Sequence, residues 1–199
     1  MNDPPHVAPE VGVLALQGAF APHLAAFARL GVQAREVRRG EDLEGLSHLV
    51  LPGGESTTIR HLLDLFGLTE ELVARTRAGQ LALFGVCAGA ILLGADADDR
   101  PRRLGLLDAH LERNGFGRQA ESFTEELHVD GAPMRGVFIR APRIASVGAD
   151  VRVLARRGDE PVLVESGGCL AATFHPELSG SDRLHARFLA APRAALPAG

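Results

Sequence analysis

The fold is decided by the stretch Leu81-Ala82-Leu83-Phe84-Gly85-Val86-Cys87-Ala88-Gly89-Ala90-Ile91-Leu92-Leu93. It opens with an apolar run long enough for one buried parallel strand and closes with an apolar run of helical character. Small residues separate the two runs, and Cys87 stands at the junction. The pattern therefore predicts a strand, a sharp turn and a helix, with a cysteine nucleophile at the turn.

Two glycines flank this cysteine at equal distances, Gly85 before it and Gly89 after it. A nucleophile on such a turn has a strained backbone, and its flanking positions must lack side chains so that the strand and the helix can pass closely. The free N–H groups and the dipole of the following helix favour the thiolate. The alternative is that Cys87 is a small buried hydrophobic residue.

Composition limits the class of protein. A chain of 199 residues is long enough for one domain with a substantial core, so we expect a single domain over residues 1–199, with flexible ends at 1–10 and 191–199. The net charge of −4 and the pI near 6.1 argue against nucleic acid as a partner. No apolar run approaches the ~18 residues of a membrane span, and the first ten residues lack the pattern of a secretory signal.

The cysteine and lysine content excludes two further kinds of chemistry. Only two cysteines occur, Cys87 and Cys169, so no disulfide framework is expected and a reducing, cytoplasmic location is predicted. The chain contains no lysine, because all 21 of its lysine-plus-arginine residues are arginine. Schiff-base chemistry on a lysine is therefore excluded for this chain.

The first half of the chain alternates strands and helices. Strands are expected at residues 11–16, 32–37 and 46–51, and helices at 20–30, 56–66 and 70–78. Ser56 or Thr57 is the expected N-cap of the second helix, and Gly67 its stop. This order is typical of a doubly wound parallel sheet, whose ligands lie beyond the carboxyl ends of the strands.

The second half contains short strand-like segments instead. They are separated by Gly, Asp, Asn and Pro, which favours antiparallel hairpins and an extension of the sheet, and they fall at 104–112, 122–129, 136–139, 151–155, 161–164 and 169–174. An exposed connection is expected at 95–103 and a closing helix at 182–190. The predicted fold is therefore α/β and three-layered, with a mostly parallel central sheet, helices on both faces and an antiparallel extension.

A cysteine hydrolase needs a base and a group that orients the base. Of the eight histidines, His175 has the most suitable setting, because His175-Pro176-Glu177 directly follows a predicted strand. Proline fixes the backbone there, and residues two apart can project to the same side of an extended segment. We expect Glu177 to orient His175, and most of the other histidines to lie at the surface.

A glycine pair and the spacing of the Cys and His residues also bear on the site. The segment Pro52-Gly53-Gly54-Glu55-Ser56 lets backbone N–H groups approach a ligand, so Gly54 and Ala88 are expected to form an oxyanion hole, although plain turn chemistry would also explain the two glycines. No zinc-binding spacing of Cys and His is present, so no metal site is expected. Cys169 is expected to pack inside its strand.

Together these motifs resemble the class I glutamine amidotransferases. Within that class the sequence is similar to the glutaminase subunits of pyridoxal 5′-phosphate synthase over about residues 11–189, through the segments Leu16-Gln17-Gly18, Pro52-Gly53-Gly54-Glu55-Ser56-Thr57-Thr58, Arg113-Asn114-Gly115-Phe116-Gly117-Arg118-Gln119, Phe138-Ile139-Arg140-Ala141-Pro142 and Phe174-His175-Pro176-Glu177. Val86 and Gly115 depart from the family pattern, but neither position carries the chemistry.

The resemblance implies a function and a site. Cys87 would attack the side-chain amide of glutamine, His175 would move the proton and Glu177 would orient His175. Ammonia would pass to a separate synthase subunit in a hetero-oligomer, without a cofactor, and we class the chain with both hydrolases and lyases. The substrate would be held by Gly54, Glu55, Ser56, Arg113, Ile139 and Arg140, with Gln17 assisting the oxyanion hole.

Two alternatives remain open. The chain could serve another synthase, such as one that makes histidine or purine intermediates, although the segments 113–119 and 139–142 argue against this. It could also be a catalytically silent subunit that retains the fold for assembly.

Overall fold

The computed structural model describes residues 9–95, 103–113, 122–191 and 196. The expected connection over 96–102, the motif residues 114–119 and most of the two expected flexible ends lie outside the described residues. Leu196 in the C-terminal segment is described. Its N–H donates to the carbonyl of Arg77, and its side chain packs against the core.

The centre of the molecule is a seven-stranded sheet with the order β2-β1-β3-β4-β11-β10-β9. The first five strands of this order are parallel, and β10 and β9 extend the sheet antiparallel. The expected mostly parallel sheet with an antiparallel extension is therefore confirmed. The strands are β1 Val11–Leu14, β2 Ala34–Val37, β3 His48–Leu51, β4 Ala82–Val86, β9 Arg152–Arg157, β10 Glu160–Ser166 and β11 Cys169–Ala172.

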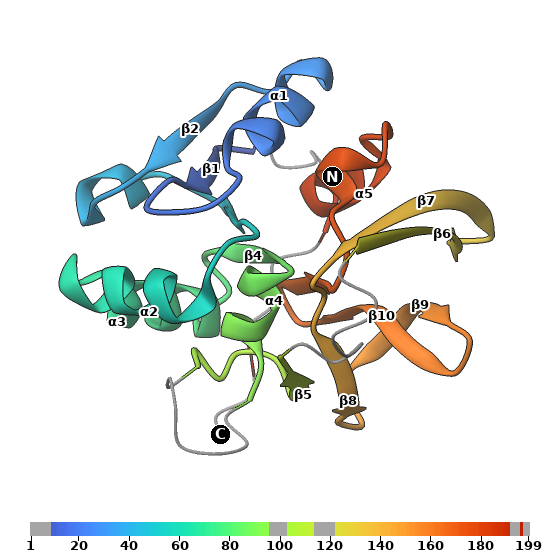
Figure 1. The fold of residues 1–199 in the computed structure, drawn as a ribbon. Coiled ribbons are helices and arrows are strands. Elements are labelled where there is room, and N and C mark those ends of the chain that lie inside the picture. Colours follow the sequence, from blue (N-terminus) through green and yellow to red (C-terminus); the bar gives the residue numbers. More distant parts are fainter. Residues whose placement is uncertain (1–8, 96–102, 114–121, 192–195, 197–199) are drawn as a thin grey trace, which may run out of the picture.

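Helices cover both faces of the sheet (Figure 1). On one face lie α1 and α5, and on the other α2, α3 and α4. The reason is visible in β3, where Val50 joins one core and Leu49 and Leu51 join the other, because successive strand residues face opposite sides. The helices are α1 Ala21–Arg29, α2 Ser56–Leu65, α3 Leu68–Arg77, α4 Ala88–Leu93 and α5 Arg183–Leu189.

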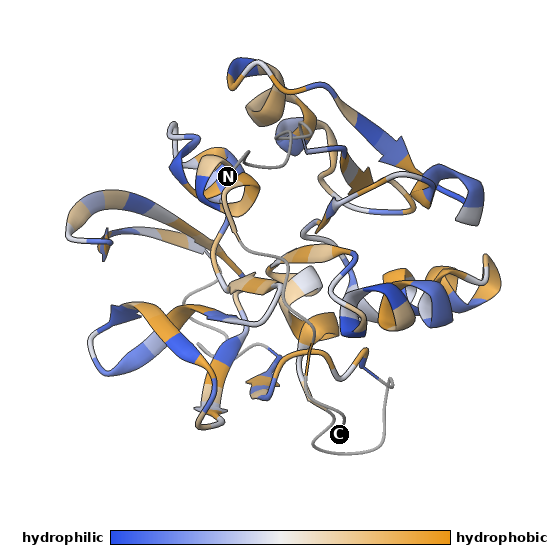
Figure 2. Cartoon of the chain, turned by 180° about the vertical axis from the view of Figure 1, so that it is seen from behind, coloured by the Kyte–Doolittle hydropathy of each residue, from blue (hydrophilic) through white to orange (hydrophobic). Residues whose placement is uncertain are grey.

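The apolar residues collect where these layers meet. Figure 2 shows hydrophobic residues concentrated on the central strands and hydrophilic residues on the outer helices and hairpins. Phe27 of α1, Phe84 of β4 and Phe188 of α5 are fully buried on one face. Leu63 and Leu72, from α2 and α3, are fully buried on the other. The sheet thus has an apolar core on each side, as a doubly wound fold requires.

Two antiparallel pairs stand beside the central sheet. β5 Ala109–Glu112 pairs with β8 Arg143–Val147, and β6 Ser122–Val129 pairs with β7 Ala132–Ile139. β8 was not expected from the sequence, and β7 begins before the expected residue 136. The expectation for residues 169–174 also needs correction, because β11 pairs antiparallel with β10 on one side and parallel with β4 on the other.

The start of α2 differs from the expectation too. The N-cap is Glu55, whose carboxylate accepts hydrogen bonds from the N–H groups of Thr57 and Thr58, so neither Ser56 nor Thr57 caps the helix. At the other end Gly67 adopts a φ of 66°, as expected for a helix stop. Short 3₁₀ turns occur at η1 Gly40–Leu43 and η2 Pro176–Leu178.

Candidate active site

Cys87 occupies the sharp turn between β4 and α4. Its φ of 50° and ψ of −101° lie in a region that non-glycine residues rarely adopt. A Cβ on Gly89 would lie 1.9 Å from the carbonyl oxygen of Leu51, and one on Gly85 would lie 2.6 Å from that of Gly89. The strained cysteine and its two obligatory glycines therefore match the turn expected from the sequence.

The register of the sheet brings the imidazole of His175 to this sulfur. Ala172, the last residue of β11, lies opposite Val86, the last residue of β4, and the N–H of Cys87 donates to the carbonyl of Ala172 at 2.8 Å. Because the two strands are parallel, both chains leave the sheet at the same edge. His175 then places its ring within hydrogen-bonding reach of the Cys87 side chain.

Glu177 lies behind the imidazole. Its Oε1 is 2.7 Å from Nδ1 of His175, and both residues are buried. Burial alone would lower the pKa of His175, but the hydrogen bonds with Cys87 and Glu177 outweigh burial and raise it to about 10. Burial would likewise raise the pKa of Glu177, but the hydrogen bond with His175 keeps that pKa below its usual value. The pair is thus arranged to hold an imidazolium beside a carboxylate.

A cavity of about 490 Å³ opens over the sulfur. Cys87 and His175 form part of its wall, whereas Glu177 lies behind His175 and is not part of the lining. Every other residue expected to bind glutamine or to form the oxyanion hole lines the same cavity: Gln17, Gly54, Glu55, Ser56, Ala88, Arg113, Ile139 and Arg140. Residues from six separate parts of the sequence therefore converge on one site.

Glycines allow the loops of this cavity to touch. A Cβ on Gly18 would lie 2.0 Å from the carbonyl oxygen of Gly53, and a Cβ on Gly53 would lie 2.5 Å from Cε1 of His175. The side chain of Gln17 fixes the peptide between Gly54 and Glu55, because its Oε1 accepts a hydrogen bond of 2.9 Å from the N–H of Glu55. The glycine-rich turn is thus packed directly against the imidazole.

Further polar groups line the same cavity. Arg113 donates from Nη1 to the hydroxyl of Thr57 at 2.9 Å and lies 4.0 Å from the Glu55 carboxylate. The Glu55 carboxylate itself is used by the cap of α2, and hydrogen bonds led by that from the Thr58 hydroxyl lower its pKa to about 2. The carbonyl of Ile139 lies 3.9 Å from the Cys87 sulfur, and Arg140 follows with a φ of 43°.

The expectation that the other histidines lie at the surface is wrong for three of them. His23, His48 and His185 are all buried. A signal was present in the sequence, because His23 is four residues before the buried Phe27 and His185 three before the buried Phe188, so each lies on the apolar face of its helix. His23 and His185 lie behind Glu177, beyond the cavity.

The second cysteine is buried away from this site. Cys169 is in β11, and burial raises the pKa of its thiol to about 12. Within the described part of the chain, no group of three or more His, Cys, Asp or Glu side chains is arranged to hold a metal ion. Only Cys87 therefore combines a thiol with an open cavity and a neighbouring imidazole.

A doubly wound sheet with a cysteine turn and a His-x-Glu segment at one edge is the architecture of the class I glutamine amidotransferases. A family model described as the SNO glutamine amidotransferase family matches residues 13–192. The chain belongs to this family.

Individual relatives agree with the family match. "Pyridoxal 5′-phosphate synthase subunit PdxT" of Thermus thermophilus is 57% identical over 182 residues, which cover 90% of this chain and 95% of the relative. A protein of the same name from Mycolicibacterium vanbaalenii is 50% identical over 191 residues, covering 92% and 97%. The resemblance stated from the sequence motifs is therefore confirmed.

Solved structures support the fold. One described as "Crystal structure of glutamine amidotransferase" has a TM-score of 0.88 and 54% identity, covering 90% of this chain and 97% of its own. "Structure of PurLQS from Thermotoga maritima" has a TM-score of 0.69 at 18% identity, covering 92% and 99%, which shows similarity of fold alone.

One expectation is overturned by the family match. The classification as a lyase is wrong, because the matching family is one of glutamine amidotransferases, whose glutaminase step cleaves a C–N bond with water and is a hydrolysis. As for the membrane, none of the helices among the described residues is long and apolar enough to cross one.

Proposed function

We propose that the chain hydrolyses L-glutamine to L-glutamate and ammonia, and that it passes the ammonia to a separate synthase subunit that makes pyridoxal 5′-phosphate. The observation that carries the proposal is the hydrogen-bonded series of Cys87, His175 and Glu177 at the wall of a cavity. The names of the relatives at 57% and 50% identity support the assignment to this synthase.

The reaction follows from the roles that these three side chains can take. The sulfur of Cys87 attacks the amide carbon of glutamine, and the imidazolium of His175 gives its proton to the departing nitrogen. Ammonia leaves and a thioester remains. A water molecule that loses a proton to His175 then attacks the thioester, so that glutamate departs and the sulfur is free again. Glu177 holds Nδ1 of His175, which leaves Nε2 facing the sulfur.

The negative charge on the attacked carbonyl oxygen needs N–H donors. Ala88 begins α4, so its N–H has no partner within the helix, and Gly54 provides the second donor. Gln17 assists by holding the peptide that follows Gly54. These groups support the proposal of an oxyanion hole formed by Gly54 and Ala88.

The rest of the cavity binds the substrate. Because the Glu55 carboxylate caps α2, we assign its contribution, with those of Gly54 and Ser56, to backbone groups. The guanidinium of Arg113 is placed to pair with the α-carboxylate of glutamine. The carbonyl of Ile139, close to the sulfur, is suited to accept from the side-chain amide, and Arg140 borders the same wall.

The partner follows from what this chain lacks. It contains no lysine, so any imine chemistry on a lysine must belong to the synthase subunit. Ammonia in water at neutral pH becomes ammonium and loses its nucleophilicity, so the two subunits must dock as a hetero-oligomer. We place the complex in the cytoplasm, where a reducing environment keeps the thiol of Cys87 free.

The direct test is the release of glutamate with the synthase subunit present. Cys87→Ala should lower the rate by about a thousandfold or more, whereas Cys169→Ala should retain it. Equal rates for the wild type and Cys87→Ala would instead indicate a catalytically silent assembly subunit. Activation by an imidazole-forming or nucleotide-forming synthase, and not by a lysine-dependent one, would indicate a glutaminase of another pathway.

A further inference from the structure

Behind Glu177 lies a buried contact that the reaction above does not use. Oε1 of Glu177 binds His175, and Oε2 faces Nε2 of His23 at 3.7 Å. The side chains of Glu177 and His23 are both 0% exposed. Among the described residues, neither Oε2 nor this Nε2 has a hydrogen-bond partner. Buried polar atoms seldom lack partners, so the two atoms point to an interaction with each other.

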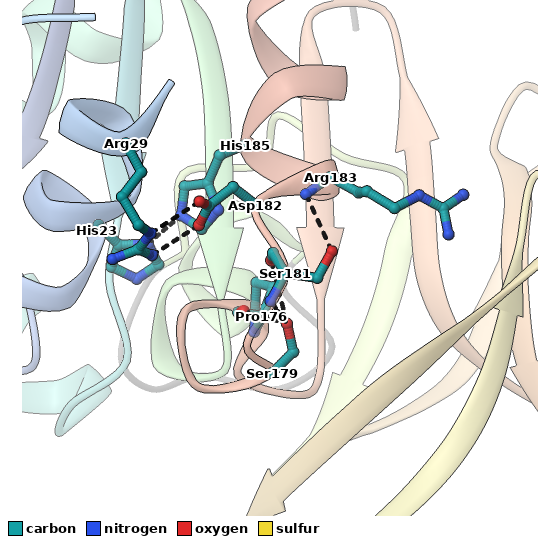
Figure 3. Close-up of polar contacts among 8 residues, drawn as sticks. All are labelled: His23, Arg29, Pro176, Ser179, Ser181, Asp182, Arg183 and His185. Atoms are coloured by element: carbon teal, nitrogen blue, oxygen red, sulfur yellow. Dashed lines mark hydrogen bonds and ion pairs between the residues drawn. The ribbon is translucent and has the colours of Figure 1, made fainter. Parts of the chain in front are cut away.

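His23 in turn contacts a second histidine. Nδ1 of His23 lies 2.9 Å from Nε2 of His185, which joins α1 to α5 inside the core. Figure 3 draws the two histidines together with Arg29 and Asp182, whose ion pair links α1 to the start of α5. The ring of His185 packs edge-on against Phe27.

Both histidines are neutral at neutral pH. Burial is the main cause and lowers each pKa to about 4. The charged and titratable groups that face His23 are Glu177, His185 and His175. Those that face His185 include Glu177, Asp182 and Arg29.

Neutral rings constrain where the protons lie. A carboxylate only accepts hydrogen bonds, so the nitrogen of His23 that faces Glu177 carries the proton. Nδ1 of His23 is then an acceptor, and Nε2 of His185 must donate to it. A donating Nε2 of His185 is thus compatible only with the tautomer of His23 that directs an N–H group at Oε2 of Glu177.

On this basis we propose that His23 is a positioning residue for the hydrolysis of glutamine and that His185 sets its tautomer. His23 holds Oε2 of Glu177, so that Oε1 stays directed at His175. While His175 is an imidazolium, the N–H group of His23 faces the Glu177 carboxylate at 3.7 Å and stabilises the negative charge that balances the imidazolium. The inference rests on the proposed function, which assigns His175 and Glu177 to the hydrolysis of glutamine.

The test compares two substitutions of one residue. In His23→Gln the amide nitrogen can occupy the place of Nε2, whereas His23→Leu retains similar volume and has no donor. With the synthase subunit present, His23→Leu should lower kcat about 10- to 100-fold with KM for glutamine unchanged, and His23→Gln should restore most of kcat. Equal losses of kcat in the two variants would refute the inference.

Two controls isolate the effect of His23, and a replacement variant is available. His48→Leu replaces another buried histidine, one that packs on Phe188, and should leave kcat unchanged. In a Glu177→Gln background, His23→Leu should add no further loss, because its action passes through that carboxylate. A full additional loss there would overturn the inference. If His23→Leu does not fold, His23→Asn replaces it, since its shorter amide reaches toward His185 only.

A second measurement separates this inference from the proposed function. The rate at which iodoacetamide alkylates Cys87 reports the sulfur and imidazole without glutamine. Its pH profile should shift in His23→Leu and return to that of the wild type in His23→Gln. If the wild-type complex released no glutamate, the proposed function would fail, while this profile would still show whether His23 acts on the pair of Cys87 and His175.

Discussion

Ala172 of β11 lies opposite Val86 of β4 in parallel register. Val86 is the residue directly before Cys87. The two strands are 82–86 and 169–172, so most of the second half of the chain lies between them. Their pairing turns two distant motifs into one site, because each strand delivers its functional segment to the same edge of the sheet. The predictions below depend on this placement.

An electrophilic analogue of glutamine should modify Cys87 and leave Cys169 unmodified. Cys87 lines the cavity, whereas burial raises the pKa of the Cys169 thiol to about 12 and removes the reactive thiolate. Mass spectrometry of peptides from the labelled protein distinguishes the two. Modification of Cys169 in the folded chain would contradict the buried position of β11.

Substitutions of the two partners of the thiol should differ in severity. His175→Asn removes the group that moves the proton, so kcat should fall by about a thousandfold or more. Glu177→Gln leaves the base in place but orients it poorly, and a loss of about 10- to 100-fold is expected. Steady-state glutamate release measures both. A variant of His175 with full activity would show that another group is the base.

Gly89→Ala should destabilise the fold. The added Cβ would lie 1.9 Å from the carbonyl oxygen of Leu51, a backbone atom that cannot move without displacing β3. We expect a decrease of about 1–3 kcal/mol or more in the free energy of unfolding, measured with urea. Gly40→Ala is the matched control, because a Cβ there meets nothing within 4 Å. Equal stability of the two variants would place α4 farther from β3.

Because of His23 and His185, the free energy of unfolding should decrease as the pH drops from about 6.5 to about 4. His23 and His185 have pKa values near 4 in the folded chain and near 6.5 in the unfolded chain, so the unfolded chain binds more protons in this window. His175 contributes with the opposite sign and in a higher pH range, because its pKa is raised in the folded chain. Its contribution to the free energy of unfolding is fully present below about pH 6.5 and is lost as the pH rises toward about 10.

The corresponding measurement is the free energy of unfolding against pH. The double variant His23→Gln with His185→Gln should show a shallower decrease below pH 6.5, since it lacks the two titrating groups. His61→Gln, in the exposed part of α2, serves as the control and should follow the wild type. An unchanged slope in the double variant would mean that the two histidines are already charged in the folded chain.

Several parts of this structure follow from residues that are neighbours in the sequence. Gly85, Cys87 and Gly89 specify the strained turn, because the required backbone and the absent side chains are properties of adjacent positions. His175 and Glu177 are likewise two residues apart, so their pairing is local. Alternating strands and helices were sufficient to predict the parallel half of the sheet.

Other features depend on contacts between distant segments, and only the tertiary structure decided them. The short pieces after residue 104 carry no signal for whether a strand joins the parallel sheet, and β11 does so because β4 offers a free edge beside it. His23 and His185 are 162 residues apart, so their contact cannot be predicted from the sequence, although each lies on the apolar face of its helix. Their burial behind Glu177 arises from the packing of α1 against α5. Local sequence determines backbone geometry, whereas partners across the core are determined by how whole elements pack.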